Sequence, residues 1–133
     1  RSVGIIGLIT TLLLFVAFFV SIHTKEIIFD ILLSEKYNSI SVYWPYALTS
    51  FGLLGLAQIL SMALRTESAS NLLIIPKNTC YIVGCVLVVY GAYLDGIWGI
   101  IVAMNTTAAV HLLWIAKIFS EKFGLYKMSF VDD

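Results

Sequence analysis

The chain alternates between long apolar runs and short polar connections. Four runs carry no charged residue, namely residues 2–22, 39–64, 78–94 and 96–116. Each is close to the roughly 20 residues that a helix needs to cross a hydrocarbon layer about 30 Å thick, because a helix rises about 1.5 Å per residue. A membrane barrel would instead show alternating segments of about 10 residues, which are not visible here. The pattern therefore predicts an all-α integral membrane protein with four transmembrane helices.

Polar and turn-forming residues set the expected bounds of these helices. Pro76 suits the first turn of a helix, because its missing N–H has no intrahelical partner there. Asp95 and Gly96 predict a tight turn, since glycine tolerates the left-handed backbone that ends a helix and the Asp side chain can accept from the first free N–H groups of the next one. We expect one domain of two helical hairpins, with spans at residues 2–22, 45–64, 76–94 and 97–119.

Two segments outside the spans are also partly apolar. On a helix, residues 24–34 place four apolar side chains on one side and four polar ones on the other, with Thr24 as a plausible N-cap. This pattern predicts a short amphipathic helix at the membrane surface, and Phe29 on its polar side indicates a partner or the bundle covering it. Residues 120–133 are less polar than a disordered tail, so we expect a C-terminal tail that docks on another surface.

Aromatic and small residues refine the predicted bundle. Tyr43, Trp44, Tyr46 and Trp98 are the predicted anchors at a membrane face, because amphipathic aromatic rings favour the level of the lipid headgroups. Residues 45–64 contain many Gly, Ala and Ser positions, which let helix backbones approach closely. We therefore expect this span to pack against other helices rather than to be surrounded by lipid.

Composition and charge agree with a membrane protein. Of the 133 residues, 60% are hydrophobic and 12% are charged, about half the charged fraction of a soluble domain. The net charge is zero and no basic cluster occurs, so a nucleic acid is not an expected partner. Cys80 and Cys85 lie five apart on one predicted helix and point to different sides, which excludes a disulfide between them.

The distribution of basic residues predicts the orientation. With four spans, both termini and the second connection share one membrane face. That face would carry six basic residues and the opposite face only Lys25 and Lys36; the six are Arg1, Arg65, Lys77, Lys117, Lys122 and Lys127. Basic residues concentrate on the side from which insertion occurs. Both termini are therefore expected on the cytoplasmic, matrix or stromal side.

The interior of the spans offers few groups for chemistry. It holds no Asp, Glu, Lys or Arg, whereas transporters coupled to protons or ions keep an ionisable residue at membrane depth. His111 is the one titratable side chain predicted deep within the membrane, about 20 Å from the face at which Asp95 and Gly96 lie. Gln58 is predicted at a similar depth. We expect polar contacts between helices from Gln58, Asn105, Thr107 and His111. The glycosylation pattern at Asn105 lies inside a span, where no glycosylating enzyme reaches.

His111 also allows a cofactor interpretation. A bis-His haem within this chain would need His23, which lies about 20 Å away in depth, so that arrangement fails on distance. A haem or chlorophyll shared with another subunit remains open, with His111 as its ligand. No zinc spacing, phosphate loop or Cys-x-x-Cys motif is present.

These features predict a protein without catalytic groups. The expected function is a non-catalytic accessory subunit of a larger membrane complex, respiratory, photosynthetic or similar, that contacts lipids and other subunits. The alternative is a small carrier or binder of an apolar ligand such as a quinone, sterol or lipid, lined by Gln58, Tyr90, Asn105 and His111. A small transporter is a third alternative, which the absence of embedded carboxylates disfavours.

Overall fold

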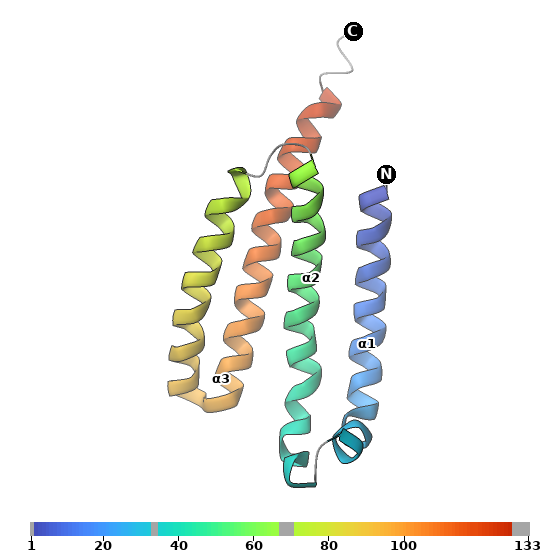
Figure 1. Cartoon of the computed structure of the whole chain (residues 1–133), viewed down its shortest axis with the longest axis vertical. Coiled ribbons are helices and arrows are strands. Elements are labelled where there is room, and N and C mark those ends of the chain that lie inside the picture. The colour runs from blue at the N-terminus through green and yellow to red at the C-terminus, as the bar shows by residue number, and fades with distance from the viewer. Residues whose placement is uncertain (1, 33–34, 67–70, 129–133) are drawn as a thin grey trace.

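The computed structural model describes residues 2–32, 35–66 and 71–128. Within these ranges the chain forms helices and no strand. In chain order they are α1 (Ser2–Leu32), the short 3-10 helix η1 (Glu35–Tyr43), α2 (Trp44–Thr66) and α3 (Asn71–Met128). Figure 1 shows the long helices running side by side along one axis.

Three of these helices are long and apolar enough to cross a membrane. The apolar stretches are Leu8–Ile31, Ser39–Arg65 and Asn71–Lys122, and at most 28% of the residues in any of them are buried inside the chain. Large apolar side chains therefore point outward over most of the length of the molecule. Apolar surface on this scale is covered by lipid or by a protein partner.

Helix α3 is folded back on itself. Its backbone leaves helical geometry at Asp95 (φ −142°, ψ 23°) and Gly96 (φ 56°, ψ −131°), the two residues at which the sequence predicts a turn. Figure 1 shows the two arms, residues 71–94 and 97–128, running in opposite directions. The Asp95 side chain makes no hydrogen bond with a described residue, so the expected bond to the free N–H groups of the second arm is absent.

Glycines bring the two arms of α3 into backbone contact near the turn. A Cβ atom added at Gly91 would collide with the carbonyl group of Gly99, and one added at Gly99 would collide with that of Gly91. Further along, a Cβ at Gly84 would lie 2.8 Å from Cγ2 of Thr107. The hairpin therefore closes only because these positions have no side chain.

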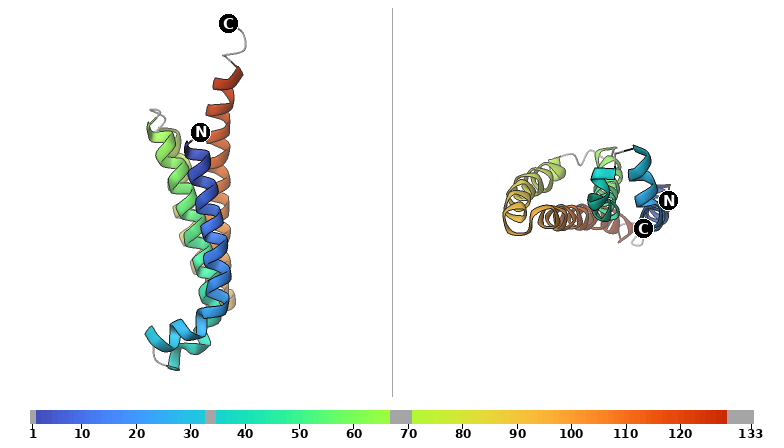
Figure 2. Two further views of the ribbon diagram at one scale, coloured as in Figure 1. Left: turned by 90° about the vertical axis from the view of Figure 1, so that its right-hand side faces the viewer. Right: turned by 90° about the horizontal axis from the view of Figure 1, so that it is seen from below.

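Helix α2 packs against both of the other long helices. On one side Gly52 accommodates Leu14 of α1, whose Cδ1 would lie 2.9 Å from a Cβ added at Gly52. On the other side Leu64 forms a buried core with Leu73 and Ile115, one from each arm of α3. Seen along the helix axes, α1 lies at one edge of the molecule and the first arm of α3 at the other (Figure 2).

Residues 24–32 are helical, as the sequence predicts, but they continue α1 and do not form a separate helix. Helix α1 continues without interruption from Ser2 to Leu32, and residues 33–34 lie outside the described part of the chain. The Thr24 hydroxyl donates to the carbonyl of Val20 at 2.8 Å, which is a bond within a helix and not an N-cap. Figure 2 shows instead that the last turns of α1 bend away from the axis of the rest.

Two further helix bounds differ from the sequence prediction. The first arm of α3 begins at Asn71, five residues before Pro76, because Leu73 is buried against Leu64 and Ile115 and extends the helix upstream. Pro76 removes a single hydrogen bond near the start of this arm. The second arm continues to Met128, so residues 120–128 are helical rather than a tail, whereas residues 129–133 lie outside the described ranges.

Candidate functional site

A polar cavity lies where α2 meets both arms of α3. Three elements contribute its lining, which mixes basic, neutral polar and apolar side chains. The residues are Gln58, Ser61 and Arg65 from α2, Leu73 and Lys77 from the first arm, and His111 and Ile115 from the second arm.

Helical spacing places these side chains together. Gln58, Ser61 and Arg65 are separated by three and four residues, so they share one face of α2. His111 and Ile115 are four apart on the second arm and likewise share a face. The Ser61 hydroxyl donates to the carbonyl of Ala57 at 2.7 Å, so its hydrogen bond is made within α2. Gln58, Arg65, Lys77 and His111 therefore provide the polar groups of the cavity.

The cavity is small. The centre of a water molecule can reach about 10 Å³ of it, which is close to the smallest space that holds one water. His111 is 4% exposed and its ring centroid lies 6.3 Å from that of Tyr81. The cavity itself has no room for a haem or chlorophyll ring, and a role of His111 as ligand of a cofactor shared with another subunit stays a prediction.

The charge around the cavity is positive. Arg65 is exposed and Lys77 is half-buried, and within the described part of the chain neither forms an ion pair with a carboxylate. The Lys77 ammonium lies 6.0 Å from the Tyr81 ring centroid, at the outer limit of a cation–π contact. Because no described carboxylate pairs with either basic group, both can attract an anion.

Asn105 lies apart from the cavity and connects two helices. Its side-chain N–H donates to the carbonyl of Tyr46 in α2 and to that of Ile101 in its own helix, each at 3.0 Å. The Thr107 hydroxyl donates to the carbonyl of Ala103 at 2.8 Å. Gln58 and His111 share the cavity, but no hydrogen bond joins them.

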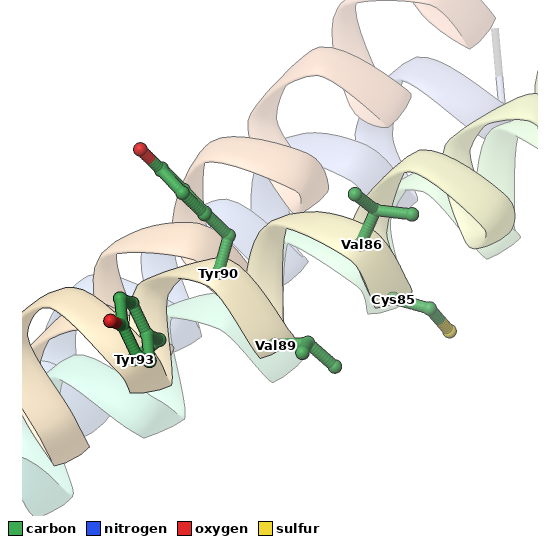
Figure 3. A pocket seen from close by; sticks show the side chains of 5 residues that line it. All are labelled: Cys85, Val86, Val89, Tyr90 and Tyr93. Carbon is green, nitrogen blue, oxygen red and sulfur yellow. The ribbon is translucent and has the colours of Figure 1, made fainter.

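Tyr90 also lies apart, on the outer face of the first arm of α3. It lines a shallow groove with Cys85, Val86, Val89 and Tyr93, all from this one arm. Figure 3 shows these side chains fanning out from the helix rather than enclosing a space. The four polar residues expected to line one ligand site are therefore spread over three places, with only Gln58 and His111 together.

The predicted anchor residues gather near the turn of α3. The Trp98 ring centroid lies 6.0 Å from that of Tyr43 and 5.1 Å from that of Tyr46. Trp44 packs edge to face on Phe29 of α1 at 6.0 Å. These contacts join η1 and α2 to the second arm of α3, and α1 to α2. Their role as membrane anchors stays a prediction.

Sequence reasoning did not find the basic groups of the cavity. Arg65 and Lys77 follow and precede apolar runs, where a basic residue usually marks only the end of a span. The sequence does contain one indication. Arg65 and Lys77 are separated only by a short connection between two apolar runs, which places both residues at the same end of a helix pair. Comparisons with models of protein families, with curated proteins and with solved structures find no match for this chain.

Proposed function

We propose that this chain crosses a membrane four times, with each arm of α3 as one crossing. The support is the turn at Asp95 and Gly96 between two arms, each of which exceeds the roughly 20 residues needed to span. In Figure 1 the start of α1, the end of α2 and the end of α3 lie at one end of the molecule. The excess of basic residues in the sequence near this end supports the proposal that it lies on the cytoplasmic, matrix or stromal side.

We further propose that the protein is a non-catalytic subunit of a larger membrane assembly. The observation that carries this proposal is the packing of α1. This helix contacts α2 and η1, and only 11% of its apolar stretch is buried. Leu8, Leu12 and Phe15 are each more than 60% exposed. A helix that packs against a single long helix at the edge of the molecule can present a broad apolar face to a helix of another subunit.

A native gel tests the assembly directly. The protein is extracted gently from its native membrane, and its companions are identified by mass spectrometry. We expect a large assembly with defined partners, and migration alone or as a small homo-oligomer would contradict the proposal. Matched variants sharpen the test: Ile27→Ser with Ile31→Ser changes exposed side chains on α1 and should release the partners. His111→Leu, a change at a buried residue, should leave assembly intact.

A second candidate function is binding of an apolar ligand such as a lipid or sterol. A groove of about 150 Å³ between the arms of α3 favours it; its lining residues are Thr79, Cys80, Val83, Leu87, Thr106, Thr107, Val110 and Trp114. Under this function Val83→Trp would fill the groove and reduce the ligand that copurifies, with assembly unchanged. The same variant should have no effect on copurified lipid if the chain acts only as a subunit.

A further inference from the structure

We infer that Arg65, Lys77 and His111 form a binding site for a phosphate group at the mouth of the polar cavity between α2 and the arms of α3. The phosphate belongs either to a lipid headgroup or to a soluble phosphate compound. This role goes beyond assembly, because it assigns a ligand to a defined site within one chain.

The two basic side chains supply the charge that such a site requires. Arg65 in the last turn of α2 and Lys77 in the first arm of α3 line the same cavity. A guanidinium group can donate to two phosphate oxygens at once, and an ammonium group adds a compact positive charge. Among the described residues no carboxylate neutralises either group, so their charge is available to a ligand.

His111 adds to the cavity a polar group that makes no hydrogen bond with a described residue. Its side chain is 96% buried, since 4% of it is exposed, yet its imidazole makes no hydrogen bond with another described residue. An imidazole always has at least one N–H donor, and the ring nitrogens of His111 are not among the enclosed side-chain atoms that lack a partner, so they reach accessible space. One water in the cavity, or a phosphate oxygen at its mouth, would supply the partner.

The position of the site suits a lipid phosphate. From the turn at Asp95, Lys77 lies about 27 Å along the first arm, close to the full hydrocarbon thickness of about 30 Å. With the topology proposed above, the site is level with the headgroups of the more basic face. Basic pockets between membrane helices on that face bind anionic lipid headgroups. A soluble phosphate compound would reach the same mouth from water.

The basic residues also have structural roles, which the test has to separate from ligand binding. Arg65 complements the negative C-terminal end of α2, and Lys77 lies near the Tyr81 ring. A purely structural role would lower thermal stability without any ligand. A ligand role makes stability and binding depend on phosphate.

The experiment titrates the purified full chain in detergent micelles and counts bound molecules by native mass spectrometry. The probes are dilauroyl phosphatidic acid, the matching diacylglycerol without phosphate, and sodium phosphate. We expect phosphatidic acid to bind and diacylglycerol not to bind. Arg65→Gln and Lys77→Gln should each weaken binding about tenfold, the loss of a charge-assisted hydrogen bond. Lys117→Gln is the matched control, because Lys117 is exposed at the same end but outside the cavity.

The outcomes decide between the site and its sources. If sodium phosphate displaces phosphatidic acid, or if sodium phosphate binds and the lipid does not, the natural ligand is a soluble phosphate compound. If only the lipid binds, the natural ligand is a lipid headgroup. Equal binding of diacylglycerol, or equal weakening by all three substitutions, would overturn the site. If a Gln variant fails to fold, Arg65→Lys replaces it, because lysine keeps the positive charge but cannot donate to two phosphate oxygens at once. Binding of phosphatidic acid as strong in Arg65→Lys as in Lys117→Gln would overturn the role of the guanidinium.

Discussion

At the scale of single residues, the contact between Gly91 and Gly99 determines whether the arms of α3 can close. A side chain at Gly99 would collide with the backbone of the facing arm. We expect Gly99→Ala to lower the free energy of unfolding by about 1–3 kcal/mol, the usual cost of overpacking, as measured by denaturation in mixed micelles. Gly55→Ala is the control, because nothing lies within 4 Å of a Cβ at that position. Equal effects of the two substitutions would contradict the backbone contact.

Asn105 provides a second test at this scale. Replacing it with Leu removes the hydrogen bond to the Tyr46 carbonyl that connects the second arm of α3 to α2. We expect a loss of about 0.5–1.5 kcal/mol, the range found for hydrogen bonds between membrane helices. The neighbouring Thr106 donates only to Val102 of its own helix, so Thr106→Val should change stability far less. A ranking in the reverse order would argue against the contact between helices.

Residue chemistry explains which parts of the site could be predicted from sequence. Counting the helical rise from each end placed Gln58 and His111 at one depth, and both line the cavity. Depth does not specify which faces of the helices meet, so the convergence of Arg65 and Lys77 was missed. Tyr90 was expected to line a ligand site but lies on an outer face, because apolar residues surround its whole helix and leave no periodic signal for its inner face.

At the scale of elements, the turn within α3 depends on one backbone conformation. Gly96 has φ 56°, and a Cβ there would meet nothing within 4 Å. The cost of Gly96→Ala is therefore conformational rather than steric, and we expect about 1 kcal/mol lower stability. Asp95→Ala should have a smaller effect, since Asp95 has negative φ and is exposed. Thermal unfolding of the two variants in the same detergent checks this difference.

The elements also show where sequence patterns stop being informative. The turn at Asp95 and Gly96 was predictable because glycine has a specific backbone role there. The continuation of α1 through Thr24 was not, since a helix that bends keeps its hydrogen bonds and leaves no breaker in the sequence. The start of α3 at Asn71 depends on the burial of Leu73 against two other helices, and such tertiary packing overrides the preference of Pro76 for a first turn.

At the scale of the whole molecule, the proposed assembly and the proposed phosphate site depend on the same topology. The proposed four crossings would bring Arg65 and Lys77 to the face with the most basic residues and place the turn of α3 on the opposite face. The edge position of α1 leaves its apolar side available to a neighbouring subunit. An alternative path for α3 would remove both consequences, so both proposals depend on the two arms of α3 crossing the membrane in opposite directions.

Labelling of single cysteines tests whether the two arms of α3 cross the membrane in opposite directions. With Cys80 and Cys85 replaced by Ala, single cysteines are introduced as Asp95→Cys at the turn and Glu121→Cys near the far end of α3, both at exposed positions. A maleimide that cannot cross membranes is applied to sealed vesicles of known orientation. We predict that the two cysteines react from opposite sides. Reaction of both from one side, or protection of Asp95→Cys from both sides, would contradict the hairpin.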